Sequence, residues 1–207
     1  MLRPTRIPLF PLDVVLLPAM ALPLHIFEPR YRLMIARCLD EKLEFGMILA
    51  SNNNIATMGC TAEIVRKIRD YPDGRLDIAT EGRAIFRLTE LLDEKDYYEG
   101  VVEYVADEPS SLDAGKRARL VTTFEQAHEF LFGQPWLQGP SEDEATLAYR
   151  MAALLPIELE KRQELLESRS ESHRRDLVLG WINALLPRLS DRERARKRAG
   201  GNGHTLN

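Results

Sequence analysis

Four prolines interrupt the most apolar stretch of this chain, and they restrict its fold more than any other sequence feature. The stretch runs from Ile7 to Arg32, and its apolar part also contains the charged residue Asp13. The interrupting prolines are Pro8, Pro11, Pro18 and Pro23, and a fifth proline, Pro29, follows them near the end of the stretch. A transmembrane helix needs roughly 20 consecutive apolar residues, and a proline inside a helix costs about 3 kcal/mol. The stretch therefore does not predict a membrane span.

The same stretch has some features of a secretion signal. Arg3 and Arg6 provide a basic start, and Ala19–Ala21 is similar to a cleavage site with small residues. Asp13 and the repeated prolines, however, fall where a signal peptide needs an unbroken apolar helix. We therefore expect this segment to be part of the folded protein, and the protein to be cytoplasmic.

The proline spacing fits short extended segments instead. Ile7–Leu12, Val14–Leu17 and Leu22–Phe27 are apolar runs bordered by prolines, which strands tolerate where no ladder donor is needed. Pro29 suits the first position of a helix, and the apolar spacing continues that helix to about Glu41. The opening predicts strand, turn, strand and helix.

Further strands follow up to about residue 109. In this region, segments that alternate apolar and polar residues, or that are apolar throughout, are separated by turn signals. The clearest turn signal is Tyr71–Arg75, which contains Pro-Asp-Gly. Gly82 is expected to break a strand. The predicted strands are Glu44–Ala50, Gly59–Tyr71, Leu76–Thr80, Ala84–Leu91 and Tyr98–Val105.

After Pro109 the apolar period changes from two to 3.6 residues, which predicts helices. Three of these helices cover about 112–132, 156–167 and 171–186, and another begins at the capping box Ser141–Glu144. Pro187 is expected to end the last helix. The predicted organisation is a mostly β subdomain (1–109), a helical bundle (110–187) and a basic, largely disordered tail (188–207).

The charge distribution argues against broad binding to polyanions. The chain has 28 basic and 32 acidic residues. Removing the six basic and two acidic residues between Arg188 and Ala199 leaves 22 basic and 30 acidic ones, so the body is acidic. Nucleic acids and anionic lipids bind through basic residues. We expect neither as a partner.

Residues for catalysis or metal binding are not evident. The chain lacks a phosphate-binding loop and the common hydrolase and metalloprotease motifs, and Cys38 and Cys60 have no neighbouring ligand at metal spacing. We predict no catalytic residue, no metal and no cofactor, and expect both cysteines to be buried thiols. Arg83 and Arg87 could anchor an anion, although ion pairs with Glu81 or Glu90 are the simpler interpretation.

Several motifs resemble one known family. They are Pro11-Leu-Asp13, Pro18, Pro23-Leu-His-Ile-Phe-Glu-Pro-Arg-Tyr-Arg32, Gly59, Pro72-Asp-Gly74, Glu81-Gly-Arg-Ala-Ile-Phe-Arg87 and Leu155-Pro-Ile-Glu-Leu-Glu-Lys-Arg-Gln-Glu-Leu-Leu166. Together they are similar to the N-terminal, substrate-binding domain of Lon protease, and closer to its stand-alone and RING-linked relatives than to Lon itself. The resemblance extends over residues 5 to 187.

The resemblance implies an α+β fold: a PUA-like β-barrel with one helix, followed by a helical bundle. It also implies a stand-alone module without ATPase or protease domains, which binds unfolded or extended protein segments and works alone or with a separate ATPase or protease. Candidate contacts are Phe10, Leu24, Phe27 and Tyr31, although apolar residues at this spacing also suit a core.

Two other functions remain open at this point. PUA-like barrels also occur in RNA-associated proteins, which makes an RNA-binding protein the alternative, although the acidic body opposes it. An enzyme acting on a small molecule would need a deep pocket with converging polar groups.

Overall fold

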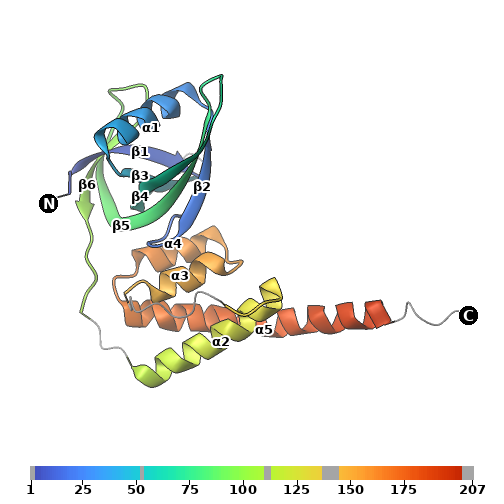
Figure 1. Cartoon of the computed structure of the whole chain (residues 1–207). Coiled ribbons are helices and arrows are strands. Elements are labelled where there is room, and N and C mark those ends of the chain that lie inside the picture. The colour runs from blue at the N-terminus through green and yellow to red at the C-terminus, as the bar shows by residue number, and fades with distance from the viewer. Residues whose placement is uncertain (1–2, 52–53, 110–112, 137–144, 202–207) are drawn as a thin grey trace, which may run out of the picture. The chain divides into compact units, whose positions relative to one another are not determined.

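The computed structural model describes residues 3–51, 54–109, 113–136 and 145–201. The chain forms two compact units, Met1–Glu108 with Glu158–Arg169, and Pro109–Ile157 with Ser170–Asn207. The first is rich in β-structure and the second is helical (Figure 1). The expected α+β class, with a β-rich part followed by helices, is confirmed.

The β-rich unit contains six strands and two helices among its described residues. They are β1 (Arg6–Leu12), β2 (Ala21–Ile26), α1 (Pro29–Glu41), β3 (Phe45–Ser51), β4 (Asn54–Asp70), β5 (Leu76–Leu92), β6 (Glu99–Tyr104) and α4 (Leu159–Glu167). The sheet order is β2-β5-β4-β3-β1-β6, and β6 also pairs with β5. This last pairing closes a barrel from β5, β4, β3, β1 and β6, and leaves β2 attached to β5.

The opening folds as strand, turn, strand and helix, as its prolines predict. Pro8 and Pro11 lie inside β1, a strand with two neighbours. Residues 6–8 pair with β6 and residues 9–12 pair with β3, so neither neighbour spans the whole strand. Each half of β1 therefore has one edge at which a proline, which lacks an N–H, removes no hydrogen bond between strands.

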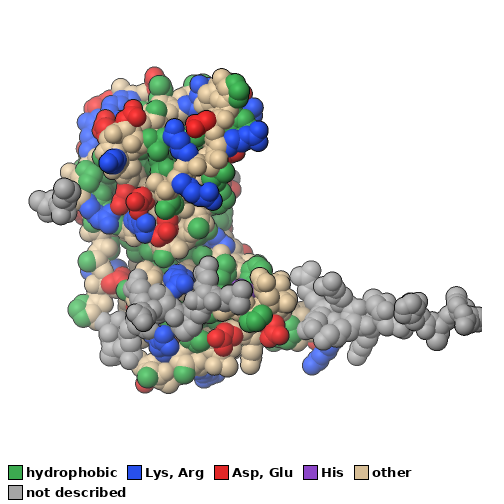
Figure 2. All heavy atoms as spheres, viewed as in Figure 1, with side chains coloured by type: hydrophobic (Ala, Val, Ile, Leu, Met, Phe, Trp, Pro, Cys, Tyr) green, Lys and Arg blue, Asp and Glu red, His purple; other side chains and the backbone are tan. Residues whose placement is uncertain are grey.

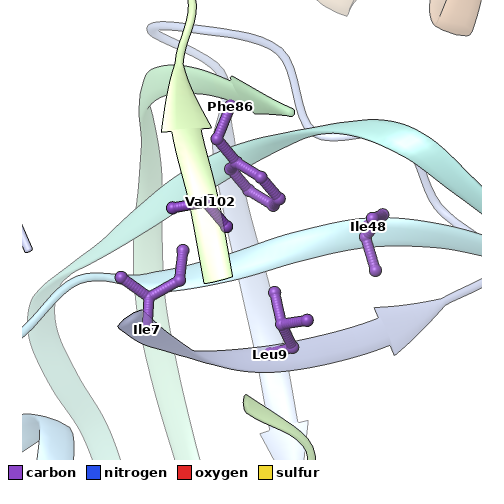
Figure 3. Packing of buried hydrophobic residues seen from close by; sticks show 5 residues of the cluster. All are labelled: Ile7, Leu9, Ile48, Phe86 and Val102. Atoms are coloured by element: carbon purple, nitrogen blue, oxygen red, sulfur yellow. The ribbon is translucent and has the colours of Figure 1, made fainter. Parts of the chain in front are cut away.

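The barrel core is filled by apolar side chains from strands far apart in sequence. Ile7, Leu9, Ile48, Phe86 and Val102 form one buried cluster (Figure 3). Glycines allow the strands to approach it: a Cβ on Gly59 would lie 2.4 Å from the ring of Phe86. The core therefore depends on small as well as large residues.

Gly82 does not end a strand, contrary to the sequence-based expectation. β5 runs through it without a break, from Leu76 to Leu92. The glycine instead lets the irregular segment before β2 approach β5, because a Cβ at this position would lie 2.1 Å from the Leu17 carbonyl oxygen. Its carbonyl accepts a hydrogen bond from the Ala19 N–H (2.9 Å), and its N–H donates to the Met20 carbonyl (3.0 Å).

The helical unit contains α2 (Ala114–Phe132), α3 (Leu147–Leu154) and α5 (Glu171–Gly201) among the residues placed. Helix α5 continues through Pro187, although the sequence predicts its end there. The capping box at Ser141–Glu144 and residues 202–207 of the expected tail lie outside the described residues.

The observed units change between Glu108 and Pro109, close to the predicted boundary, but one later segment does not follow the predicted organisation. Residues Glu158–Arg169, which include α4, belong to the β-rich unit. There, Gln163 Nε2 donates to the Met58 carbonyl on β4 (3.2 Å), and the Glu108 N–H donates to the Arg169 carbonyl (2.8 Å). The chain thus returns to its first unit before it completes the second.

Candidate binding surface

Two of the four predicted contact residues belong to the core. Phe10 and Tyr31 are only 5% and 4% exposed, and their ring centroids lie 4.1 Å apart. Tyr31 stands in the first turn of α1 on the buried stripe with Met34, Ile35 and Cys38. These two rings hold α1 against β1, and in this fold they are not available to a partner.

The other two lie at the surface. Phe27, between β2 and α1, is 58% exposed, and Leu24 on β2 is half-buried. Leu33, which sequence reasoning missed, is 54% exposed. Leu33 does not belong to the buried apolar face of α1. An apolar residue outside that face is the sequence signal that could have identified it.

An aromatic and ionic cluster adjoins Phe27. The rings of His25 and Phe27 stack with their centroids 6.0 Å apart, and the rings of His25 and Tyr71 form a T-shaped pair with centroids 5.7 Å apart. Asp77 joins them: His25 Nδ1 lies 2.5 Å from Asp77 Oδ1, and the Tyr71 hydroxyl donates to Asp77 Oδ2 (2.8 Å). Bonding to His25 and Tyr71 lowers the pKa of the Asp77 carboxyl, and bonding to Asp77 raises the pKa of Tyr71.

Tyr71 also borders a hollow between α1 and the turn that joins β4 to β5, which we call the α1–turn hollow. Its volume is about 240 Å³. It is lined by Arg32, Ala36, Leu39, Asp40, Lys67, Asp70, Tyr71, Gly74, Arg75 and Leu76. A shallower depression beside it shares Arg32, Ala36 and Gly74 and reaches Pro29 and the exposed Leu33. Phe27, the ring cluster and the hollow thus form one continuous surface.

The turn itself is shaped for this arrangement. Gly74 has φ = 82°, and a Cβ there would lie 2.1 Å from Arg32 Nη2. Glycine is favoured at positive φ, and here it also gives the Arg32 guanidinium room. The Tyr71–Arg75 turn is confirmed by hydrogen bonds from the Tyr71 N–H to the Arg75 carbonyl (3.0 Å) and from the Gly74 N–H to the Tyr71 carbonyl (2.9 Å).

Basic side chains surround the hollow, but most have partners. Arg75 pairs with Asp73 at 2.7 Å, and Lys67 lies 3.6 Å from Asp70. Within the described part of the chain, Arg32 has no carboxylate within 4 Å. Figure 2 shows basic and apolar side chains close together on the β-rich unit, with acidic ones among them.

The other candidates have structural roles. Arg83 pairs with Glu63 at 2.5 Å and also with Glu81, which confirms the ion-pair interpretation for this residue. Cys38 and Cys60 are buried thiols, as expected, and burial raises both pKa values, that of Cys38 to about 12. Among the residues that the structure places, no group of three or more His, Cys, Asp or Glu residues could hold a metal ion.

A comparison with protein families identifies this fold. The model of the ATP-dependent protease La (LON) substrate-binding domain matches residues 6–184, which is most of the chain. The chain belongs to the LON substrate-binding domain family. The resemblance that the sequence motifs indicate is therefore confirmed.

Curated relatives of this LON-family chain are named as Lon proteases. Lon protease of Escherichia coli (strain K12) is 25% identical over 93% of this chain and 26% of its own length. Lon protease 1 of Syntrophobacter fumaroxidans is 26% identical over 92% of this chain and 25% of its own length. The chain spans about a quarter of the length of these two relatives.

Solved structures of LON-family domains share the fold. A Lon N-terminal domain protein from Xanthomonas campestris has a TM-score of 0.68 and 28% identity, covering 86% of this chain and 98% of that chain. The N-terminal domain of Mycobacterium avium complex Lon protease has a TM-score of 0.66 at 14% identity, with the same coverage, and shows the fold alone. In the described part of this chain, no helix is long and apolar enough to cross a membrane.

Proposed function

We propose that this chain is a non-catalytic polypeptide-recognition module, which binds exposed apolar, extended segments of other proteins. The observation that carries the proposal is the pair of exposed apolar side chains Phe27 and Leu33. Phe27 precedes α1 and stacks on His25, and Leu33 lines the depression beside the α1–turn hollow. Exposed apolar patches of this kind serve as protein contact sites. Membership of a substrate-binding domain family supports the same function.

Phe27 is the central contact of this proposal. It exposes 58% of its surface although burial of a phenylalanine contributes about 1.5–3 kcal/mol. The His25–Tyr71 ring pair extends the aromatic area around it. The captured segments would then pass to an ATPase or protease carried by another protein in the cytoplasm. The RNA-binding alternative is opposed by the 22 basic and 30 acidic residues of the chain outside Arg188–Ala199.

The test is a titration of the protein with fluorescently labelled β-casein, an unstructured polypeptide, followed by anisotropy. We expect saturable binding that weakens about tenfold or more in the Phe27→Ser variant, because a buried aromatic anchor is lost. Leu91→Ser is the matched control, since Leu91 is 40% exposed and pairs with Gly100 near the other end of β5. Absence of binding, or equal weakening in both variants, would contradict the proposal.

A further inference from the structure

The free edges of the sheet are poorly suited to adding a strand from a partner. Among the described residues, β2 pairs only with β5, and its centre is Pro23, which has no N–H. Residues 63–70 of β4 pair only with β5 as well, and their pairing shifts register between Ile64 and Arg66 and between Lys67 and Arg69. Prolines, bulges and charges on edge strands oppose strand addition. Side chains and chain ends are the features that this surface can recognise.

The α1–turn hollow has both apolar and basic side chains in its lining. Its apolar wall comes from Ala36, Leu39 and Leu76, and Leu33 adjoins it. Its basic side chains outnumber its acidic ones, and Arg32 has no carboxylate partner among the residues placed. Guanidinium groups bind carboxylates in a two-point geometry. The hollow therefore suits a group that presents a carboxylate beside an apolar side chain.

Arg32 has the space to make such a contact. Its guanidinium lies against Gly74, whose missing side chain provides the space. It also lines both the hollow and the adjoining depression, which the exposed Leu33 lines as well.

We infer that the α1–turn hollow binds the free C-terminus of a polypeptide whose last residue is apolar. Only a C-terminal residue carries a carboxylate on the same carbon as its apolar side chain, whereas aspartate and glutamate replace the apolar side chain with the acid. A volume of about 240 Å³ is below the usual range for drug-sized ligands and suits one or two residues. This inference rests on the proposed function, and names the class of substrate that this surface selects.

The test compares labelled ten-residue peptides of one sequence ending in leucine, with either a free C-terminal carboxylate or a C-terminal amide. The unmodified protein is expected to bind the free acid about tenfold or more tightly, because charge-assisted hydrogen bonds to Arg32 are lost in the amide. Arg32→Gln is expected to remove that preference. Arg30→Gln is the matched control on the same helix, since Arg30 already pairs with Glu28 at 2.8 Å and does not line the hollow.

A third peptide, amidated and ending in aspartate, separates the C-terminus from an acidic side chain. If this peptide binds as tightly as the leucine peptide with a free carboxylate, the inference is overturned. Equal binding of the leucine acid and amide, with both weakened by Phe27→Ser, would overturn it too while leaving the proposed function intact. Absence of binding by every peptide and by β-casein would contradict both. The comparison of acid with amide needs only the unmodified protein, so it decides the question even if Arg32→Gln fails to fold.

Discussion

At the scale of single residues, Glu99 is the ionic centre of the β-rich unit. Its carboxylate on β6 is only 3% exposed, and it accepts hydrogen bonds from Arg6 on β1 (2.6 Å), Arg37 on α1 (2.6 Å) and Lys95 (2.9 Å). Desolvation raises its pKa, but the bonds from Lys95, Arg6 and Arg37 outweigh this and lower it to about 2 from an ordinary value of 4.5. One carboxylate thus links the paired strands β1 and β6 to α1.

We predict that Glu99→Gln lowers the free energy of unfolding at pH 7 by about 2–3 kcal/mol, because it removes one partner from a buried ion-pair network whose cations are partly exposed. The pKa is lower in the folded state, so this stabilisation is fully present above about pH 4.5 and is lost as the pH falls towards 2.

Urea unfolding at pH 7 and pH 2.5 measures this. The two proteins should differ in stability at pH 7 and approach each other at pH 2.5. A difference that is constant across this range would show that Glu99 acts through packing and not through its charge.

At the scale of secondary-structure elements, β5 shows how one edge of a strand can pair with two neighbours. Its first part pairs with β2 and its last part with β6, while β4 runs along its other edge. Gly82 lies between these two parts, where the segment after β1 approaches the strand. Sequence patterns indicate correctly that Gly82 is special, but they assign it a break because the partner, Leu17, is distant in the chain.

Gly82→Ala is predicted to lower the free energy of unfolding by about 1–3 kcal/mol, because the added methyl group meets the Leu17 carbonyl and must displace backbone. Gly180→Ala in α5 is the control, since a Cβ there meets nothing within 4 Å and helix propensity favours alanine. Thermal and urea unfolding of both variants provide the measurement. If Gly82→Ala were as stable as the original protein, the close approach would not be a constraint.

At the scale of the whole molecule, the order of the chain does not follow the order of its units. Residues Pro109–Ile157 begin the helical unit, Glu158–Arg169 return to the β-rich one, and Ser170 onward completes the helical one. A sequence pattern of consecutive helices predicts one helical bundle, because periodicity shows that a helix has an apolar face without showing which surface covers it.

We predict that Gln163→Pro in the middle of α4 destabilises the β-rich unit, since a proline inside a helix costs about 3 kcal/mol and the Gln163 bond to Met58 is lost. Hydrogen exchange on the full chain should show reduced protection in α4 and in β4 near Met58, with α2 unchanged. Loss of protection in α2 with β4 unchanged would assign α4 to the helical unit.

Local features of this chain could be derived from its sequence alone. The start of α1 at Pro29, the turn at Tyr71–Arg75 and the change from strands to helices depend on neighbouring residues, whose proline chemistry, glycine chemistry and apolar period are visible in the sequence. The family motifs indicate the barrel as well.

Only the tertiary structure decided which apolar side chains face inward and which groups meet. Phe10 and Tyr31 have the same sequence character as Phe27, yet the packing of α1 on β1 buries the first two and exposes the third. Arg6 and Glu99 meet across 93 positions of the chain. The reason is physical: local conformation depends on nearby residues, whereas burial and ion pairing depend on which distant segments the closed barrel brings into contact.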